Sequence, residues 1–196
     1  MLNFNEIETH PLEPFLPSAA KLLMLGSFPP PVNRWSMDFY YPNFQNDMWR
    51  IMGLIFFSDK EYFIRDKKFH QPSVEAFCRE KGIAISDSAR QVVRTRGNAS
   101  DQHLEIITPL NLSHVLLQIP SCRSICVTGG KAAETIAGIF PILKPALKNK
   151  ETHSHILIEG QTYQFYRMPS SSRAYPKPIE FKAEAYRQMF TDLGLL

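Results

Sequence analysis

Short apolar runs alternate with longer amphipathic stretches along the chain, and turn residues separate them. Apolar runs of strand length are typical of strands buried on both faces of a sheet, and they occur at residues 21–25, 83–85 and 124–128. Residues 155–168, HILIEGQTYQFYRM, predict two further strands joined as a hairpin at Glu159-Gly160. Apolar residues at helical spacing predict helices over residues 46–57, 73–81, 131–139 and 179–193. This alternation predicts an α/β domain with a largely parallel sheet.

A stiff loop follows the first predicted strand. It begins with Gly26-Ser27-Phe28 and continues with three prolines at residues 29–31. Proline lacks a backbone N–H and has a fixed φ, so this loop is rigid, and a rigid loop at the carboxyl end of a strand is a natural ligand site. Residues 90–101 are polar and predict a loop. Because neither a repeat nor a linker interrupts the pattern, we expect residues 1–196 to form one domain.

Composition narrows the class of protein without naming a function. The 196 residues are 44% hydrophobic and 21% charged, as in globular proteins that bury one sizeable core. No run approaches the ~18 consecutive apolar residues of a membrane span, and the acidic start lacks the pattern of a signal peptide. We therefore expect a cytoplasmic protein with no membrane partner. The net charge of +3 is compatible with a polyanionic partner.

The cysteines and histidines give little sign of a metal site. Cys78, Cys122 and Cys126 are odd in number, as expected of reduced thiols. Cys122 lies just before the strand predicted at residues 124–128 and Cys126 lies within it, which is no convincing metal-ligand spacing, so we expect buried thiols. His153 and His155 are two alternate residues entering a strand, which is a weak signal. We expect no metal and no cofactor.

Small hydroxyl residues stand beside proline at two strand-to-loop transitions, Gly26 to Pro29 and Pro169 to Ser172. Together they resemble the two active-site motifs of the uracil-DNA glycosylase superfamily. The first motif extends over residues 25–53, LGSFPPPVNRWSMDFYYPNFQNDMWRIMG. It is similar to the mismatch-specific and hypoxanthine-type branches, in which a Gly-x-x-Pro loop leads to Tyr-Tyr and then to Asn-x-aromatic-Trp. The resemblance continues through residues 82–107 and 125–136 to RMPSSSRAYP, and it covers residues 21–193.

The resemblance implies a three-layer α/β/α sandwich with a short, mostly parallel, four-stranded central sheet. It also implies a monofunctional DNA N-glycosylase that hydrolyses the N-glycosidic bond of a deaminated base, uracil or hypoxanthine, and leaves an abasic site. A base inside a duplex cannot be attacked at its sugar carbon, so the enzyme flips the nucleotide into a pocket. We expect DNA with a damaged base as the partner and a monomer as the acting form.

The resemblance also assigns roles to individual residues. Asn46 and Ser27 are the catalytic residues that hold the attacking water. The base-binding residues are Gly26, Phe28, Tyr41 and Met168, with Tyr41 stacking on the base. The DNA-binding residues are Pro169, Ser170, Ser171, Ser172 and Arg173. Candidate phosphate contacts are Arg94, Arg96, Lys131 and Lys177.

The same residues also have structural interpretations. Tyr41 suits the rim of a core, and Asn46 suits the N-cap of the helix that follows it. The serine-rich loop with its nearby proline is also typical of a surface turn.

The chain departs from the uracil-specific branch at both motifs. Ser27 stands in the region of the aspartate that positions water, and Met168 stands where a histidine stabilises the departing base. The hypoxanthine-type branch has Gly-Ser in its first motif and relies on an asparagine, so it is the nearest subgroup. Three cysteines cannot supply the four ligands of an iron–sulfur cluster, and we expect none. A catalytically weak or inactive nucleic-acid-binding protein of the same fold and a hydrolase of free nucleosides are the alternatives.

Overall fold

A five-stranded sheet with the strand order β5-β2-β8-β10-β9 forms the centre of the fold. The computed structural model describes residues 6–95, 101–149 and 152–196. The strands are β2 (Leu22–Gly26), β5 (Ile83–Asp87), β8 (Ser124–Thr128), β9 (His153–Ile158) and β10 (Gln161–Met168). Strands β5, β2, β8 and β10 are parallel, whereas β9 pairs antiparallel with β10. The sheet is therefore mixed.

The prediction of a four-stranded sheet was wrong by one strand. The four parallel strands are present, but β9 joins the same sheet as an antiparallel edge strand. It does so because the predicted hairpin closes in a tight turn, in which Glu159 and Gly160 have φ angles of 48° and 79°. Two successive positive φ values match the twist of a two-residue hairpin.

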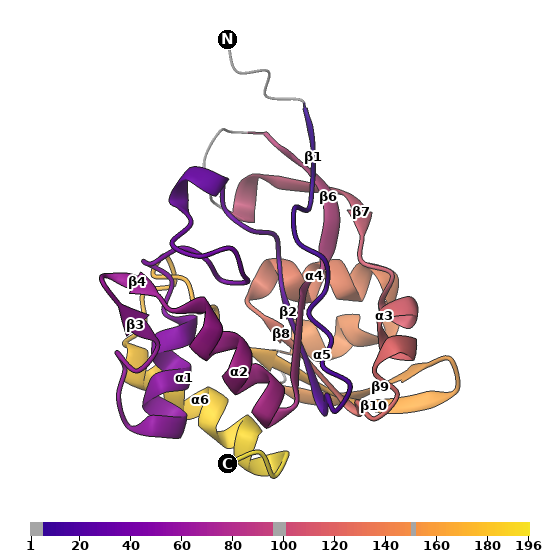
Figure 1. The fold of residues 1–196 in the computed structure, drawn as a ribbon. Coiled ribbons are helices and arrows are strands. Elements are labelled where there is room, and N and C mark those ends of the chain that lie inside the picture. The colour runs from indigo at the N-terminus through magenta and orange to yellow at the C-terminus, as the bar shows by residue number, and fades with distance from the viewer. Residues whose placement is uncertain (1–5, 96–100, 150–151) are drawn as a thin grey trace.

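Helices cover both faces of the sheet and give three layers (Figure 1). One face carries α1 (Met48–Phe57), α2 (Gln71–Lys81) and α6 (Ile179–Asp192), and the other carries α3 (Leu112–Gln118) and α4 (Gly130–Ile139). Alternate side chains of a strand point to opposite faces, so β2 contributes to two cores. Leu22 and Met24 pack in the first, and Leu23 and Leu25 in the second. The layered arrangement agrees with the expectation from sequence.

A second, smaller sheet lies next to the carboxyl end of β5. Its order is β1-β6-β7, from β1 (Ile7–Thr9), β6 (Ala89–Arg94) and β7 (Leu104–Pro109), and all pairs are antiparallel. The prediction of a loop over residues 90–101 was therefore wrong for residues 90–94. Their polar side chains are compatible with a strand because they find partners on the N-terminal segment: Arg90 with Glu13, and Arg94 with Glu8.

The remaining predicted elements differ from the observed ones by a few residues at their ends. Helix α1 begins at Met48 and α2 at Gln71. The smaller elements are β3 (Ile64–Arg65), β4 (Lys68–Phe69), α5 (Lys144–Lys148) and the 3₁₀ turns η1 (Val32–Arg34), η2 (Asp101–His103) and η3 (Pro141–Leu143). The three cysteines are buried free thiols, as predicted. In the part of the chain that the structure describes, no helix is long and apolar enough to cross a membrane.

Candidate active site

The carboxyl ends of the four parallel strands meet at one edge of the sheet, where a cavity of about 650 Å³ opens. This edge is where open parallel sheets bind ligands. Residues predicted for the site that line the cavity are Gly26, Ser27, Phe28, Tyr41, Asn46, Ser170, Ser171, Ser172 and Arg173. Two predicted residues, Met168 and Pro169, do not line the cavity. Met168 is buried in the core, and the carbonyl of Pro169 accepts a hydrogen bond from the Tyr186 hydroxyl at 2.9 Å.

Asp87 also lines this cavity, and the sequence analysis did not identify it. It is the last residue of β5 and lies level with Gly26, the last residue of β2. Its residue exposure is only 6%. A Cβ atom at position 26 would collide with Oδ1 of Asp87, so glycine is required for the carboxylate to lie against the loop. An acidic residue at the end of a buried strand was the sequence signal that could have found it.

His10 contacts the same carboxylate. Its Nε2 lies 2.9 Å from Oδ2 of Asp87, and the residue is 4% exposed. The imidazole packs edge-to-face on Phe28, with ring centroids 5.2 Å apart, and lies 5.8 Å from the ring of Tyr40. A buried charge is costly unless it is paired and hydrogen-bonded, so His10 stabilises the carboxylate of Asp87. No local pattern in the sequence singles out this histidine.

Tyr41 closes another side of the cavity. The Thr128 hydroxyl donates to the carbonyl of Leu25 at 3.3 Å, so the Tyr41 hydroxyl is the donor in its 2.9 Å hydrogen bond to Thr128. Burial, and then the charge of Asp87, raise the pKa of Tyr41 well above its ordinary value. Its φ of 52° lies in the left-handed region, a strain of roughly 1 kcal/mol or more that is commonest at functional sites.

The neighbouring aromatic residues pack against one another. Tyr40 is 2% exposed and packs edge-to-face on Phe39, as expected of a core residue. The ring of Tyr41 meets that of Trp49 edge-to-face at 6.2 Å. Stacking of Tyr41 on a base stays a prediction.

Ser27 pairs with Asp101, a second carboxylate that the sequence analysis did not identify. The hydroxyl of Ser27 donates to Oδ2 of Asp101 at 2.9 Å. Asp101 is exposed at the start of η2 and lines the same cavity. Because the proton of Ser27 is engaged, its oxygen presents lone pairs to a donor such as water.

Arg94 stabilises the first-motif loop, residues 26–31, through several contacts. Its Nη2 donates to the carbonyl of Pro29 at 2.6 Å, its Nε pairs with Glu8 at 2.8 Å, and the guanidinium lies over the Phe28 ring. The residue is 7% exposed. Arg94 therefore stabilises the loop and does not offer a free charge to a phosphate, as a candidate phosphate contact would.

Asn46 lies one residue before the N-cap of α1, which is Asp47, so the alternative of Asn46 as the N-cap was wrong by one residue. Its Oδ1 accepts a hydrogen bond from the backbone N–H of Met48 at 2.9 Å, which satisfies one free donor at the start of α1. The residue also lines the cavity. With its oxygen engaged on the helix, the amide NH₂ is the group that Asn46 has left to offer a ligand.

A network of charges fastens the serine loop to the start of α1. Asp47 Oδ1 pairs with Arg173 Nε at 3.0 Å, and its Oδ2 with Lys182 Nζ at 3.4 Å. Lys182 also donates to the carbonyl of Ser172 at 2.9 Å, and the Asp47 N–H donates to the carbonyl of Ser171 at 3.0 Å. Because Lys182 is 1% exposed, this pairing lies inside the protein. It brings the second motif beside Asn46.

Comparisons with known proteins give a likeness of structure. A scan against protein-family models finds no match, and neither does a search of curated proteins. Among solved structures, a solution NMR structure of a Methanosarcina acetivorans protein, proposed to be a uracil DNA glycosylase, matches with a TM-score of 0.62. The match covers 96% of this chain and 99% of that chain, at 21% sequence identity. The two chains share a fold. Fold alone does not determine activity, so the residues of the cavity carry the functional argument.

The other predicted cations that the structure describes do not line the cavity, although Lys131 lies near enough to Asp101 to interact with its charge. Lys131 lies in the first turn of α4, and the exposed Lys177 lies over the ring of Phe181. Arg96 falls outside the described residues. Among the side chains that the structure describes, no three His, Cys, Asp or Glu residues gather where they could hold a metal ion.

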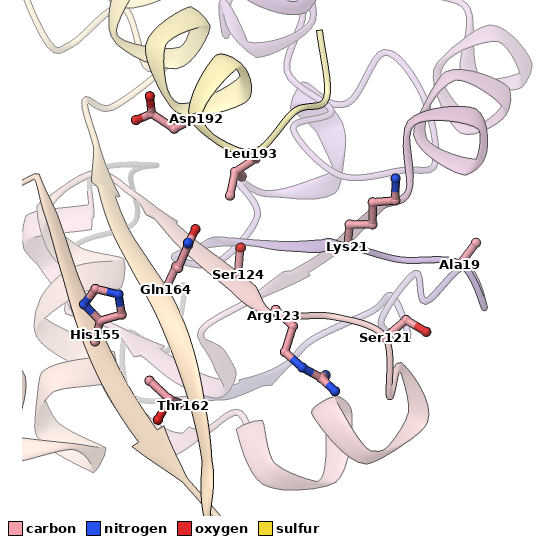
Figure 2. Close-up of a pocket in the computed structure, with 10 residues that line it drawn as sticks. All are labelled: Ala19, Lys21, Ser121, Arg123, Ser124, His155, Thr162, Gln164, Asp192 and Leu193. Atoms are coloured by element: carbon pink, nitrogen blue, oxygen red, sulfur yellow. The ribbon is translucent and has the colours of Figure 1, made fainter.

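A second cavity, of about 770 Å³, lies at the opposite edge of the sheet, where β2 and β8 begin (Figure 2). Figure 2 shows Lys21 and Arg123 diverging from one another across it. The guanidinium of Arg123 donates to the carbonyls of Pro120 and Cys122, at 2.6 and 2.7 Å. None of the predicted site residues lines this cavity. The candidate active site is therefore the cavity at the carboxyl ends of the strands.

Proposed function

We propose that this chain is a monofunctional DNA glycosylase of the uracil-DNA glycosylase superfamily, nearest to its hypoxanthine-type branch. It acts in the cytoplasm, as a monomer, on DNA that contains a deaminated base. The observation that carries the proposal is the cavity at the carboxyl edge of the sheet, where a buried carboxylate, an aromatic residue and the first-motif loop converge. The shared fold supports it.

The size and chemistry of the cavity suit a flipped base. Pockets for small ligands have volumes of roughly 300 to 1,000 Å³, and this cavity has about 650 Å³. Uracil and hypoxanthine each carry a ring N–H beside a carbonyl oxygen. Asp87 accepts a hydrogen bond from that N–H, and the ring of Tyr41 stacks on the base, which contributes ~1 to 3 kcal/mol.

The reaction is dissociative. The bond from C1′ to the base nitrogen breaks, its electron pair stays with the base, and positive charge develops on the sugar. Backbone N–H groups of the loop from Gly26 to Phe28 stabilise the departing base, since fixed donors act strongly in a dry site. A water held by the Asn46 amide and Ser27 then bonds through its oxygen to C1′. Its proton leaves through Ser27 to Asp101, and the base takes a proton from solvent.

The buried lysine behind the serine loop is not free to attack the sugar. Lys182 is bonded to Asp47 and to the Ser172 carbonyl, and the residues that line the cavity include no lysine. Strand cleavage by bifunctional glycosylases needs an amine that forms a Schiff base with C1′. We therefore propose that the product is an intact strand with an abasic site.

A panel of labelled oligonucleotides tests this proposal. Each carries one uracil, hypoxanthine, xanthine or mismatched thymine, and alkali cleaves the strand wherever a base has been released. We expect release of uracil or hypoxanthine, and no covalent adduct when borohydride is present. A trapped adduct would contradict the monofunctional mechanism. Absence of release from every oligonucleotide, with equal binding of damaged and undamaged DNA, would replace the proposal by a non-catalytic binding protein.

A further inference from the structure

The N-terminal segment forms a strap, residues 7–15, that runs past the candidate active site. At one end β1 pairs with β6, aligning Ile7 with Val93. At the other end Phe15 exchanges backbone hydrogen bonds of 2.9 Å with Ile85 of β5. His10 lies between these two attachments, and its backbone N–H donates to the carbonyl of Arg90 at 2.8 Å. The strap therefore fixes the backbone of His10 beside Asp87.

The hydrogen bonds of His10 keep its Nε2–H on Asp87 in either protonation state. In the neutral ring, Nδ1 accepts from the Leu12 N–H at 3.1 Å, and Nε2 carries the proton. In the cation, Nδ1–H donates to the Leu12 carbonyl at 2.9 Å, and Nε2 again carries a proton. A carboxylate can only accept, so Nε2 is the donor in the 2.9 Å contact with Oδ2.

Neighbouring groups hold the histidine ring and its surroundings in place. Phe28 and Tyr40 pack on the imidazole. The Tyr40 hydroxyl donates to the carbonyl of Glu13 at 3.0 Å, and Arg90 donates to the carbonyl of Leu12 at 2.7 Å. A ring fixed on several sides cannot follow a carboxylate that rotates, so it imposes one orientation on Asp87.

That orientation leaves one oxygen of Asp87 for a ligand. Oδ2 is engaged by His10, while Oδ1 lies against Gly26, close to where the Tyr41 hydroxyl also approaches. We propose that His10 is a positioning residue: it fixes Oδ2 of Asp87 so that Oδ1 accepts the ring N–H of a flipped lactam or imide base. This inference rests on the proposed function. An Oδ1 atom held in this way selects bases with a ring N–H next to a carbonyl and rejects bases that are methylated at that nitrogen.

Substitutions at position 10 test the inference through Asp87. His10→Gln places an amide N–H near the position of Nε2, whereas His10→Met fills similar space without a donor. A hydrogen bond to a charged group contributes about 1.5 to 3 kcal/mol, which corresponds to roughly 10- to 150-fold in rate. We expect His10→Met to slow single-turnover release of uracil by that factor and His10→Gln by about fivefold or less. In an Asp87→Ala background, which leaves His10 no acceptor to orient, His10→Met should have no further effect.

Thr9→Ala is the matched control, because Thr9 is exposed in the same strap and contacts Gln91 rather than Asp87. It should leave the rate within about twofold of the wild type. If His10→Met lowers the melting temperature and slows the reaction equally in both backgrounds, its role is structural and the inference is overturned. If His10→Met does not fold, His10→Asn, which is too short to reach Oδ2, takes its place. Equal rates for the wild type and for the variants that cannot donate to Oδ2 also overturn the inference.

A binding measurement separates this inference from the proposed function. Oligonucleotides carrying 2′-fluoro-2′-deoxyuridine, or its N3-methyl form, resist hydrolysis and report recognition of the base alone. We expect the wild type to prefer the unmethylated base about tenfold, and His10→Met to lose that preference. If the wild type releases no base but shows this preference, glycosylase activity fails and the role of His10 stands. If the wild type has no preference, the inference fails.

Discussion

Because Gly26 has no side chain, the carboxylate of Asp87 can lie close to its backbone inside the cavity. A Cβ at position 26 would meet Oδ1 of Asp87, and the carboxylate would have to leave its place beside the first-motif loop. The two residues end neighbouring parallel strands, so their backbones cannot separate without disturbing the sheet. The carboxylate of Asp87 can therefore occupy this position only if residue 26 is glycine.

Gly26→Ala should therefore slow base release at least tenfold with a modest loss of stability, because the displaced carboxylate no longer presents Oδ1. Gly138→Ala is the matched control. It lies in α4 with nothing within 4 Å of an added Cβ, and it should stabilise the protein by up to about 1 kcal/mol without changing the rate. Single-turnover kinetics and urea unfolding measure both effects. An unchanged rate in Gly26→Ala would show that the Asp87 position does not matter.

The sequence predicts part of the candidate site at this scale. Ser27, Tyr41 and Asn46 were found because they lie in one continuous motif, and all three line the cavity. Asp87, Asp101 and His10 come from three other segments, and only the strand register and the strap bring Asp87 and His10 together. Long-range pairings of that kind leave no local pattern in a sequence.

At the scale of elements, the buried pair of Asp47 and Lys182 joins α6 to the start of α1. Helices α1 and α6 pack against one another, and this pair ties the serine loop to their junction. Lys182 is 1% exposed, so removing its charge would leave the half-exposed Arg173 as the ion-pair partner of Asp47.

Lys182→Met should lower the free energy of unfolding by about 3 kcal/mol, because it breaks a buried ion pair and leaves the other charge behind. The exposed Lys177→Met should change it by less than about 0.5 kcal/mol. Combining Lys182→Met with Asp47→Asn should recover part of the loss. Urea unfolding gives these values, and similar stabilities for the two lysine variants would refute the structural role of Lys182.

The central strands and the long helices were predictable from the sequence, since a buried strand is a short apolar run and an amphipathic helix has apolar residues at helical spacing. The β1-β6-β7 sheet was not, because β6 carries Arg90, Gln91 and Arg94 and resembles a polar loop. Its polar side chains become compatible with a strand only when the N-terminal segment supplies Glu8 and Glu13.

At the scale of the whole molecule, buried neutral acids make the stability depend on alkaline pH. Burial raises the pKa of Cys122 from 9.0 to about 11, and it raises the pKa values of Cys126, Tyr41 and Tyr186 further above their ordinary values. A group whose pKa is higher in the folded protein than in the unfolded chain stabilises the fold at pH values below the unfolded-state pKa. That stabilisation is lost as the pH rises toward the folded-state pKa.

The urea midpoint should therefore stay level between pH 7 and 8 and fall from about pH 9 upward, as the ordinary pKa values of Cys and Tyr are passed. In the same pH 7 to 8 range, thiol reagents should modify the folded protein slowly and the unfolded protein rapidly, since the neutral thiol is unreactive. A midpoint that is constant up to pH 10.5 would mean that these groups are not held neutral by the fold.

The central claim is that the cavity at the carboxyl edge of the sheet releases a base from DNA. The most direct test is single-turnover release from a labelled uracil or hypoxanthine oligonucleotide by wild type, Asn46→Ala and Asn111→Ala. Asn111 caps α3 through a 3.0 Å hydrogen bond from the His114 N–H, so its substitution also removes an asparagine hydrogen bond at the start of a helix, but away from the cavity. The account predicts release by wild type and Asn111→Ala, and a loss of at least 100-fold in Asn46→Ala. Equal release by all three proteins, or no release by the wild type, would contradict it.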